Sequence, residues 1–481
     1  MLSEQKMQAI RNVLLRAFDA VRSSIDANMF RDYILALLVL KYISDRALVL
    51  SAGPHEQSRD AAEYRKLFDA RYEKDIGLRI DRSLSELEAS NPSLQGVFHG
   101  IHFDSNVFGN PEQSQLVLCQ LLSIFNRAEF DFRTDEKQAR ETVAAAYETV
   151  ISHVVAAIGR RGEVFFTPPE LSQLIARLMQ PAPGESLCDP CCGSGALLLT
   201  CNDLARDGSG RACRLFGQEK NGSTWALAKI NMVLHGEQNA RIEWGDTLKE
   251  PKLIAAGSLQ RFDVVVSSPP FNVKDWGQEF AACDAYGRYK RGIPPRAAAD
   301  YAFISHMVES MNPERGRMAT VVSLGVLFRG GAEQQIRTQL LQENLIDAVI
   351  GLPTKMFPHT AVPVALLVLR KKKADSKVLF VDASRDYQHG KTQNALRLED
   401  VTKIANAYRS RQDVDGYARV VSLDEILAQD SNLNVARYVD AIEEVWPVDL
   451  AALRAERATL KAELAVMESR LATLLEEAAH G

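Results

Sequence analysis

The sequence predicts an α/β protein: an open, mostly parallel sheet that follows an N-terminal all-α domain and precedes a C-terminal coiled-coil-like helix. From about residue 165 onward, short β-rich runs alternate with helical runs, which is the pattern of βαβ units. Before that point apolar residues recur at helical spacing, and after Trp446 leucines recur at threes, fours and sevens. Ligands of such sheets bind beyond the carboxyl ends of the strands.

The first predicted domain covers residues 1–160 and is helical. Residues 10–21 carry an amphipathic apolar stripe, whereas residues 33–43 are apolar almost all round and predict a buried helix. A further helix over Thr142 to Ile158 leads out of this domain, and the boundary is expected near Arg160.

The second predicted domain covers residues 161–425. Its expected helices span residues 171–178, 224–234 and 336–343. The expected strands are residues 186–188, 214–217, 241–244, 262–267, 318–324, 346–352 and 364–369.

The remaining residues, 426–481, are predicted to form a helical tail. An amphipathic helix of this kind needs a partner surface, which either another subunit or its own domain can provide. Its seam consists of Leu450, Leu453, Leu460, Leu464, Met467, Leu471 and Leu474.

The composition is that of a globular protein without a membrane span or secretory signal, so a cytoplasmic location is expected. Apolar residues make up 46% and charged residues 25% of the 481 residues. The net charge of −5 gives no overall basic excess for gripping DNA, and the basic run from Arg288 to Arg296 is interpreted as a solvated face. The seven cysteines are expected to be reduced thiols.

A glycine-containing loop follows the first predicted strand, from Asp189 through Gly193, Ser194 and Gly195. Small residues allow a ligand to approach the backbone, and the helix that the loop opens offers its N-terminus to a polar group. The cysteines beside this loop are interpreted as small buried residues rather than a zinc or redox site, so no metal is expected.

Acidic residues follow the next two predicted strands. Glu219 ends the second strand, where a carboxylate can accept hydrogen bonds from ribose hydroxyls. Asp246 ends the third strand, where it can accept from the exocyclic amine of an adenine. Together with Asp189 and the glycine loop, these two acids indicate a nucleoside pocket.

A rigid turn, Ser268-Pro269-Pro270-Phe271, ends the apolar strand at residues 262–267. The prolines remove backbone donors and leave carbonyls free to accept hydrogen bonds. The Ser268 hydroxyl and the Pro269 carbonyl can together hold an aromatic amino group, while Phe271 offers a face on which an extruded base can stack.

In their order along the chain, these motifs resemble those of the gamma-class amino methyltransferases, most closely the modification (M) subunit of type I restriction-modification systems. The resemblance implies a Rossmann-like methyltransferase fold that uses S-adenosylmethionine. It implies cofactor-binding roles for the segment Phe166-Thr167-Pro168, for the loop from Asp189 to Gly195, and for Glu219 and Asp246. Residues 37–45, 352–357 and 434–438 also resemble segments of that family outside the cofactor motifs.

The resemblance further implies methylation of adenine N6 in double-stranded DNA. A separate specificity (S) subunit would read the sequence, with two M chains flanking it and the tail binding it, and a restriction (R) subunit can join the complex. Ser268 departs from the Asn or Asp that the family usually has there, and serine is more typical of cytosine-N4 enzymes. Two alternatives therefore stay open: a cytosine-N4 methyltransferase and a catalytically idle scaffold subunit.

Overall fold

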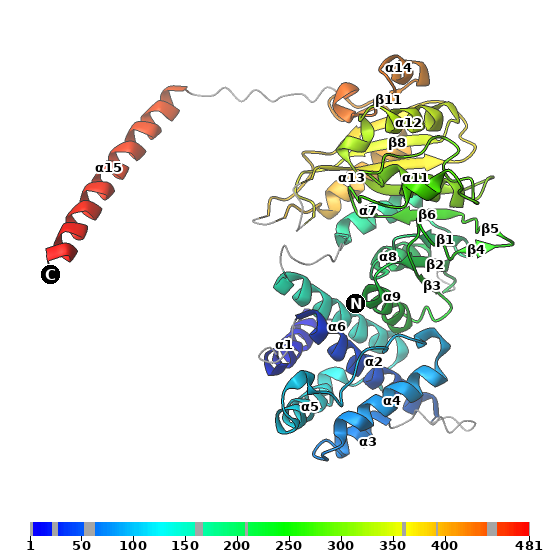
Figure 1. Cartoon of the computed structure of the whole chain (residues 1–481). Helices are drawn as coiled ribbons and strands as arrows, with labels where there is room; N and C mark the ends of the chain where they lie inside the picture. Colours follow the sequence, from blue (N-terminus) through cyan, green and yellow to red (C-terminus); the bar gives the residue numbers. More distant parts are fainter. Residues whose placement is uncertain are drawn as a thin grey trace. The chain divides into compact units, whose positions relative to one another are not determined.

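A computed structural model describes residues 3–21, 27–51, 63–158, 167–206, 210–357, 362–390, 393–439 and 450–480 (Figure 1). The chain divides into two compact units, Met1–Asp440 and Ala441–Gly481. The second unit contains the helix α15 (Leu450–His480), and each unit is described by itself.

Six helices build the N-terminal region, and α2 lies at its centre. Residues 34–39 of α2 are fully buried, as their unbroken apolar run predicts. The family-like segment at residues 37–45 ends in a buried ion pair between Lys41 and Asp45 at 2.5 Å, and Asp45 also accepts a hydrogen bond from the Phe132 backbone N–H. Since a buried charge must be paired, this segment fastens α2 to the loop before α6. The helices are α1 (Glu4–Val21), α2 (Ala27–Ser51), α3 (Glu63–Asp69), α4 (Ile76–Ser90), α5 (Pro111–Phe125) and α6 (Glu136–Ile158).

The rest of the first unit is built on a nine-stranded sheet with the order β11-β10-β8-β9-β7-β6-β1-β2-β3. All its strand pairs are parallel except those of β9 with its two neighbours and that of β10 with β11. The predicted mostly parallel sheet is thus confirmed. Its strands are β1 (Ser186–Asp189), β2 (Arg214–Glu219), β3 (Arg241–Trp244), β6 (Val264–Ser267), β7 (Arg317–Ser323), β8 (Ile346–Gly351), β9 (Val364–Arg370), β10 (Val378–Asp382) and β11 (Ala418–Val421); a separate hairpin pairs β4 (Ile254–Ala255) with β5 (Ser258–Leu259).

Helices cover both faces of this sheet (Figure 1). One face packs against α7 (Pro169–Met179), α8 (Ala196–Ala205), α9 (Gly222–Leu234) and α13 (Leu398–Ser410). The other packs against α11 (Asp300–Ser310), α12 (Ala332–Gln342) and α14 (Leu423–Ala428), and the short α10 (Gln278–Ala281) lies in the loop before α11. The strand order reverses between β1 and β6, which makes their carboxyl ends the topological switch point of the sheet.

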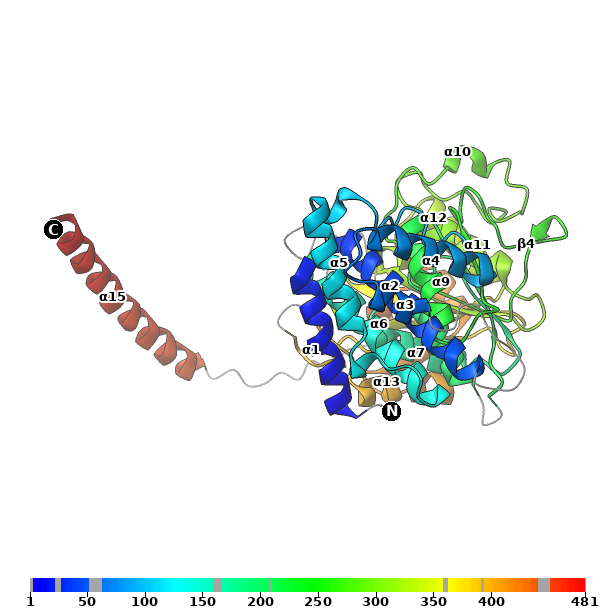
Figure 2. The same ribbon diagram turned by 90° about the horizontal axis from the view of Figure 1, so that it is seen from below.

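Helix α9 belongs to two cores at once. Its residues Leu227 and Ile230 pack into the core of the N-terminal helices, whereas Ala228 and Met232 pack into the core under the sheet. Figure 2 shows α9 among the N-terminal helices α2, α4 and α6 from below. Helix α9, which packs on the sheet, thereby joins the N-terminal helices to the rest of the first unit.

The predicted domain boundaries at residues 160 and 425 stay a proposal. Residue 160 lies outside the described residues, and residues 426–439 pack on the sheet, where Leu433 and Tyr438 are buried. In α15, the seam residues Leu460, Leu464, Met467 and Leu471 are all more than half exposed. Among the described residues, no helix has the length and apolar character needed to cross a membrane.

Candidate active site

The loops after β1 and β6 are joined at the switch point by one buried carboxylate. Asp189 at the end of β1 is 2% exposed, and its Oδ1 accepts hydrogen bonds from the Ser267 hydroxyl at 2.8 Å and from the Cys191 backbone N–H at 2.9 Å. Burial, reinforced by the nearby Glu219 carboxylate, raises the pKa of Asp189 to about 7. Asp189 therefore supports both loops from beneath.

We expect the replacement Asp189→Asn to stabilise the protein increasingly as the pH rises. The raised pKa means that the folded state holds the Asp189 proton more tightly than the unfolded state does, so the wild type loses stability as the pH rises from about 4 to about 7. Asparagine can keep both accepted hydrogen bonds without a charge. Thermal denaturation at about pH 5 and about pH 8 measures this. A difference in melting temperature that does not grow with pH would contradict the assignment.

The loop between β1 and α8 depends on two glycines with positive φ angles, 55° at Gly193 and 78° at Gly195. The positive φ angle selects glycine at position 195, where a Cβ atom would also lie 2.5 Å from Cε of Met232 on α9 and displace the end of that side chain. Asn231, also on α9, donates from Nδ2 to the Ser194 carbonyl at 2.9 Å. Its Oδ1 is buried without a hydrogen-bond partner among the described residues, which leaves an acceptor beside the loop.

Glu219, at the end of β2, accepts one backbone hydrogen bond on each carboxylate oxygen. Gly193 donates to Oε2 at 3.0 Å and Asn221 donates to Oε1 at 2.7 Å. Burial raises the pKa of this carboxyl, and the backbone donors oppose that shift. A carboxylate offers about four lone-pair sites, so Glu219 can still accept from a ligand diol while it holds the glycine loop. These residues therefore fit the ribose of a nucleoside cofactor.

Asp246, in the loop after β3, orders that loop. Its Oδ1 accepts from the backbone N–H groups of Leu248 and Lys249, and its Oδ2 pairs with Lys220 at 3.0 Å. The Lys220 side chain is 71% exposed, so a ligand amine can replace it at modest cost.

The arginine run expected to form a solvated face is partly buried, and that prediction was wrong for Arg288 and Arg291. Arg288 is 5% exposed and donates to the carbonyls of Thr247 and Leu248, directly after Asp246. Arg291 is 4% exposed and forms ion pairs with Glu309 and Glu343. Arg288 also pairs with the nearby Asp284. The sequence pattern could not reveal the role of either arginine, because the Thr247 and Leu248 carbonyls and the acids that pair with Arg291 come from other segments.

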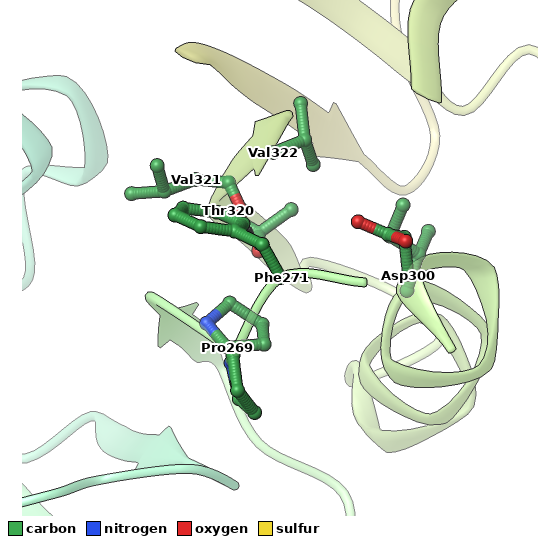
Figure 3. Close-up of a pocket in the computed structure, with 8 residues that line it drawn as sticks. Pro269, Phe271, Asp300, Thr320, Val321 and Val322 are labelled. Atoms are coloured by element: carbon green, nitrogen blue, oxygen red, sulfur yellow. Dashed lines mark hydrogen bonds between the residues drawn. The ribbon is translucent and has the colours of Figure 1, made fainter. Parts of the chain in front are cut away.

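The Ser268-Pro269-Pro270-Phe271 turn leaves the sheet at the end of β6. Ser268 and Phe271 are half-buried and Pro269 is buried. Figure 3 shows a small pocket beside the turn, in which Phe271 lies next to Thr320 and Val321 of β7. The pocket is lined by Pro269, Pro270, Phe271, Asp300, Ile304, Thr320, Val321 and Val322.

A second aromatic residue, Phe357, meets Phe271 edge to face, with ring centroids 5.7 Å apart. Residues 352–357 resemble a segment of the family, but no sequence pattern predicts that Phe357 lies beside the turn. The contact arises because Phe357 lies in the connection between β8 and β9.

The predicted segment before α7 is described only in part. Phe166 lies outside the described residues. Thr167 is half-buried, and Pro168 is buried at the N-cap of α7. Among the residues that the structure does describe, no three His, Cys, Asp or Glu side chains are arranged to hold a metal ion.

The sheet is mostly parallel, and the reversed strand β9 lies between β7 and β8. Together with the glycine loop after β1 and the acids after β2 and β3, it defines the class of Rossmann-like S-adenosylmethionine-dependent methyltransferases. Residues 138–445 match the N-6 DNA methylase family, and residues 10–125 match the HsdM N-terminal domain. The chain therefore belongs to the N-6 DNA methylase family, among the methylase subunits of type I restriction-modification systems. Proteins of this family are adenine-N6 DNA methyltransferases that use S-adenosylmethionine.

Individual relatives agree with this assignment. The chain is 30% identical to a type I restriction enzyme methylase subunit of Methanocaldococcus jannaschii, covering 92% of this chain and 80% of the relative. It is 31% identical to one of Mycoplasma pneumoniae, covering 76% and 69%. The crystal structure of the type I restriction-modification methyltransferase subunit from Streptococcus thermophilus superposes with a TM-score of 0.79 at 30% identity, covering 90% of this chain and all of that one.

Proposed function

We propose that this chain transfers a methyl group from S-adenosylmethionine to N6 of an adenine extruded from double-stranded DNA, as the modification subunit of a cytoplasmic type I complex. The observation that carries the proposal is the Asp189 link, which joins the glycine loop to Ser267, the residue directly before the Ser-Pro-Pro-Phe turn, at the switch point. Such a link keeps a cofactor site and a base site next to each other, and alignment of two reactants supplies much of the rate of a direct transfer.

The residues around the glycine loop form the cofactor site in this proposal. Glu219 accepts hydrogen bonds from the ribose hydroxyls. Asp246 accepts a hydrogen bond from the adenine amine after Lys220 is displaced. Ser194 and Gly195 present the loop backbone to the cofactor. Thr167 and Pro168, with Phe166 outside the described residues, flank the methionine end. When bound, the cofactor supplies an electrophilic methyl group.

The turn after β6 forms the base site. The Ser268 hydroxyl and the Pro269 carbonyl accept the two hydrogens of the target amine. This favours a pyramidal nitrogen whose lone pair faces the cofactor side of the site. Phe271 stacks on the base, and its edge-to-face partner Phe357 supports the ring from the side.

Sequence recognition is assigned to a separate S subunit with two M chains, and a restriction subunit can join them. The net charge of −5 supports this, because a protein that grips DNA by itself usually carries a basic excess. The tail offers a docking surface: Leu460, Leu464, Met467 and Leu471 are spaced by four, three and four residues on α15, and all are exposed.

Replacing Leu464 by glutamate is expected to abolish binding to the S subunit, because it puts a charge into the apolar seam. Val466→Glu is the matched control, since Val466 is also exposed on α15 but lies off the seam. Size-exclusion chromatography with the S subunit of the same operon measures the complex. Equal binding by both variants, or a chain ending at Asp440 that still forms the complex, would refute the role of the tail.

The decisive experiment is methyl transfer from labelled S-adenosylmethionine to unmethylated DNA, with and without that S subunit, followed by identification of the product nucleoside. N6-methyladenine that requires the S subunit supports the proposal. N4-methylcytosine would make Ser268 the mark of a cytosine enzyme, and cofactor binding without any product would support the idle scaffold. The family assignment favours the first outcome.

A further inference from the structure

A buried carboxylate, Asp300, faces the pocket beside the Ser-Pro-Pro-Phe turn. It is the first residue of α11, it is 7% exposed, and Figure 3 shows it across the pocket from Pro269 and Phe271. Its Oδ1 accepts a long hydrogen bond from the Ser323 hydroxyl at 3.4 Å. Its Oδ2 is buried without a hydrogen-bond partner among the described residues. An acceptor left in this state is costly unless a ligand supplies a donor.

The one cation near Asp300 in the described structure is already engaged by other groups. Arg329 Nη1 lies 3.7 Å from Asp300 Oδ2, but the same nitrogen donates to both oxygens of Glu333, at 3.1 and 3.3 Å. Its Nη2 donates to the Asn272 side chain and to the Ser323 hydroxyl. Two buried carboxylates thus share one guanidinium, and burial raises the pKa of Asp300 and of Glu333. Asp300 is the member of the pair with the longer ion pair, because Arg329 donates its hydrogen bonds to Glu333 and none to Asp300 Oδ2.

The neighbouring turn lacks an acceptor of the usual reach. The Ser268 hydroxyl is shorter by one atom than the Asn or Asp side chain that the resemblance to the family predicts there. Serine must also direct its own proton elsewhere before it can accept. Asn272, which directly follows the turn, is held by Arg329 within the same network as Asp300. The chain therefore has a weak acceptor, the Ser268 hydroxyl. It also has a strong acceptor, Asp300 Oδ2, which lines the adjoining pocket and accepts no hydrogen bond within the described residues.

We propose that Asp300 is a further catalytic acceptor for the target base: in the reacting complex its Oδ2 shares with the Ser268 hydroxyl the hydrogen bond from one amine hydrogen, while the Pro269 carbonyl accepts from the other. The nitrogen lone pair forms the new N–C bond while the sulfur–carbon bond breaks. The two electrons of the broken bond remain on sulfur. The nitrogen gains positive charge in this step, which a carboxylate stabilises more than a hydroxyl does, and then loses one proton to water. The inference rests on the proposed function.

The test compares Asp300→Asn with Glu333→Gln, two isosteric changes on the same arginine. For Asp300→Asn we expect kcat to fall about 30-fold, as for loss of one hydrogen bond to a charged group, with unchanged affinity for S-adenosylmethionine. Its melting temperature should stay equal to or rise above that of the wild type, because burial disfavours the Asp300 charge and Arg329 keeps its hydrogen bonds to Glu333. For Glu333→Gln we expect a kcat within about 3-fold of the wild type, because Glu333 contacts Arg329 and does not line the pocket.

A merely structural Asp300, stabilising the N-terminus of α11 or pairing with Arg329, predicts the opposite sign. In that case Asp300→Asn would lower the melting temperature, and this result would overturn the proposal, as would an unchanged kcat. Both variants are assayed in the complete M and S complex on DNA that the wild type converts to N6-methyladenine. A wild type that makes no N6-methyladenine would refute the proposed function instead, so the two failures are distinguishable.

Discussion

Replacing Glu219 by alanine is expected to weaken S-adenosylmethionine binding by about 100-fold and to reduce methylation accordingly. Two effects combine. The ribose hydroxyls lose a charged acceptor, and the backbone N–H groups of Gly193 and Asn221 lose the partner that shapes the glycine loop. Isothermal titration with S-adenosylmethionine measures the loss directly.

Glu243→Gln is the matched control for this substitution. Glu243 is an acid on the neighbouring strand β3, where it pairs with Arg241 at 2.7 Å rather than with the loop. Its replacement should leave the affinity within about 2-fold, as for an exposed ion pair. If Glu219→Ala binds the cofactor as the wild type does, the ribose assignment is wrong.

Replacing Phe271 by alanine is expected to lower kcat by about 100-fold while changing cofactor affinity by less than about 2-fold. Base stacking on an aromatic side chain contributes ~1–3 kcal/mol, which corresponds to roughly 5-fold to 150-fold in rate. The ring lines the pocket beside the turn and contacts Phe357, and neither Glu219 nor a glycine of the loop lines that pocket. Cofactor binding should therefore remain.

Phe271→Leu separates stacking from packing. Leucine keeps most of the apolar volume against Phe357 but has no aromatic face, whereas Phe271→Tyr keeps that face. We expect the tyrosine variant to retain activity and the leucine variant to lose most of it in single-turnover methylation. A fully active leucine variant, or equal losses of cofactor binding and turnover in the alanine variant, would exclude the stacking role.

Local patterns were sufficient to predict most of the sheet. The strand β3 was predicted with its observed bounds. The predicted bounds of β1, β2, β7, β8 and β9 each differ from the observed ones by one or two residues. Buried parallel strands are short continuous apolar runs, so they stand out in the sequence. The outer strands β10 and β11 and the helices α11 and α13 were not assigned. Their identity depends on the sheet edge and faces that they cover rather than on a strong pattern of their own.

The sequence by itself determined the fold class, the order of the motifs and the family, because these depend on local spacing: a glycine loop after one strand, acids after the next two and a double-proline turn after a fourth. Tertiary structure decided what each group does. Asp189 became a buried link between the glycine loop and the end of β6, Arg288 became a support for the loop after Asp246, and Asp300 came to face the pocket beside the Ser-Pro-Pro-Phe turn. Such roles depend on burial and on partners up to 78 residues apart, and a carboxylate or guanidinium has no fixed role until the folded chain supplies its surroundings.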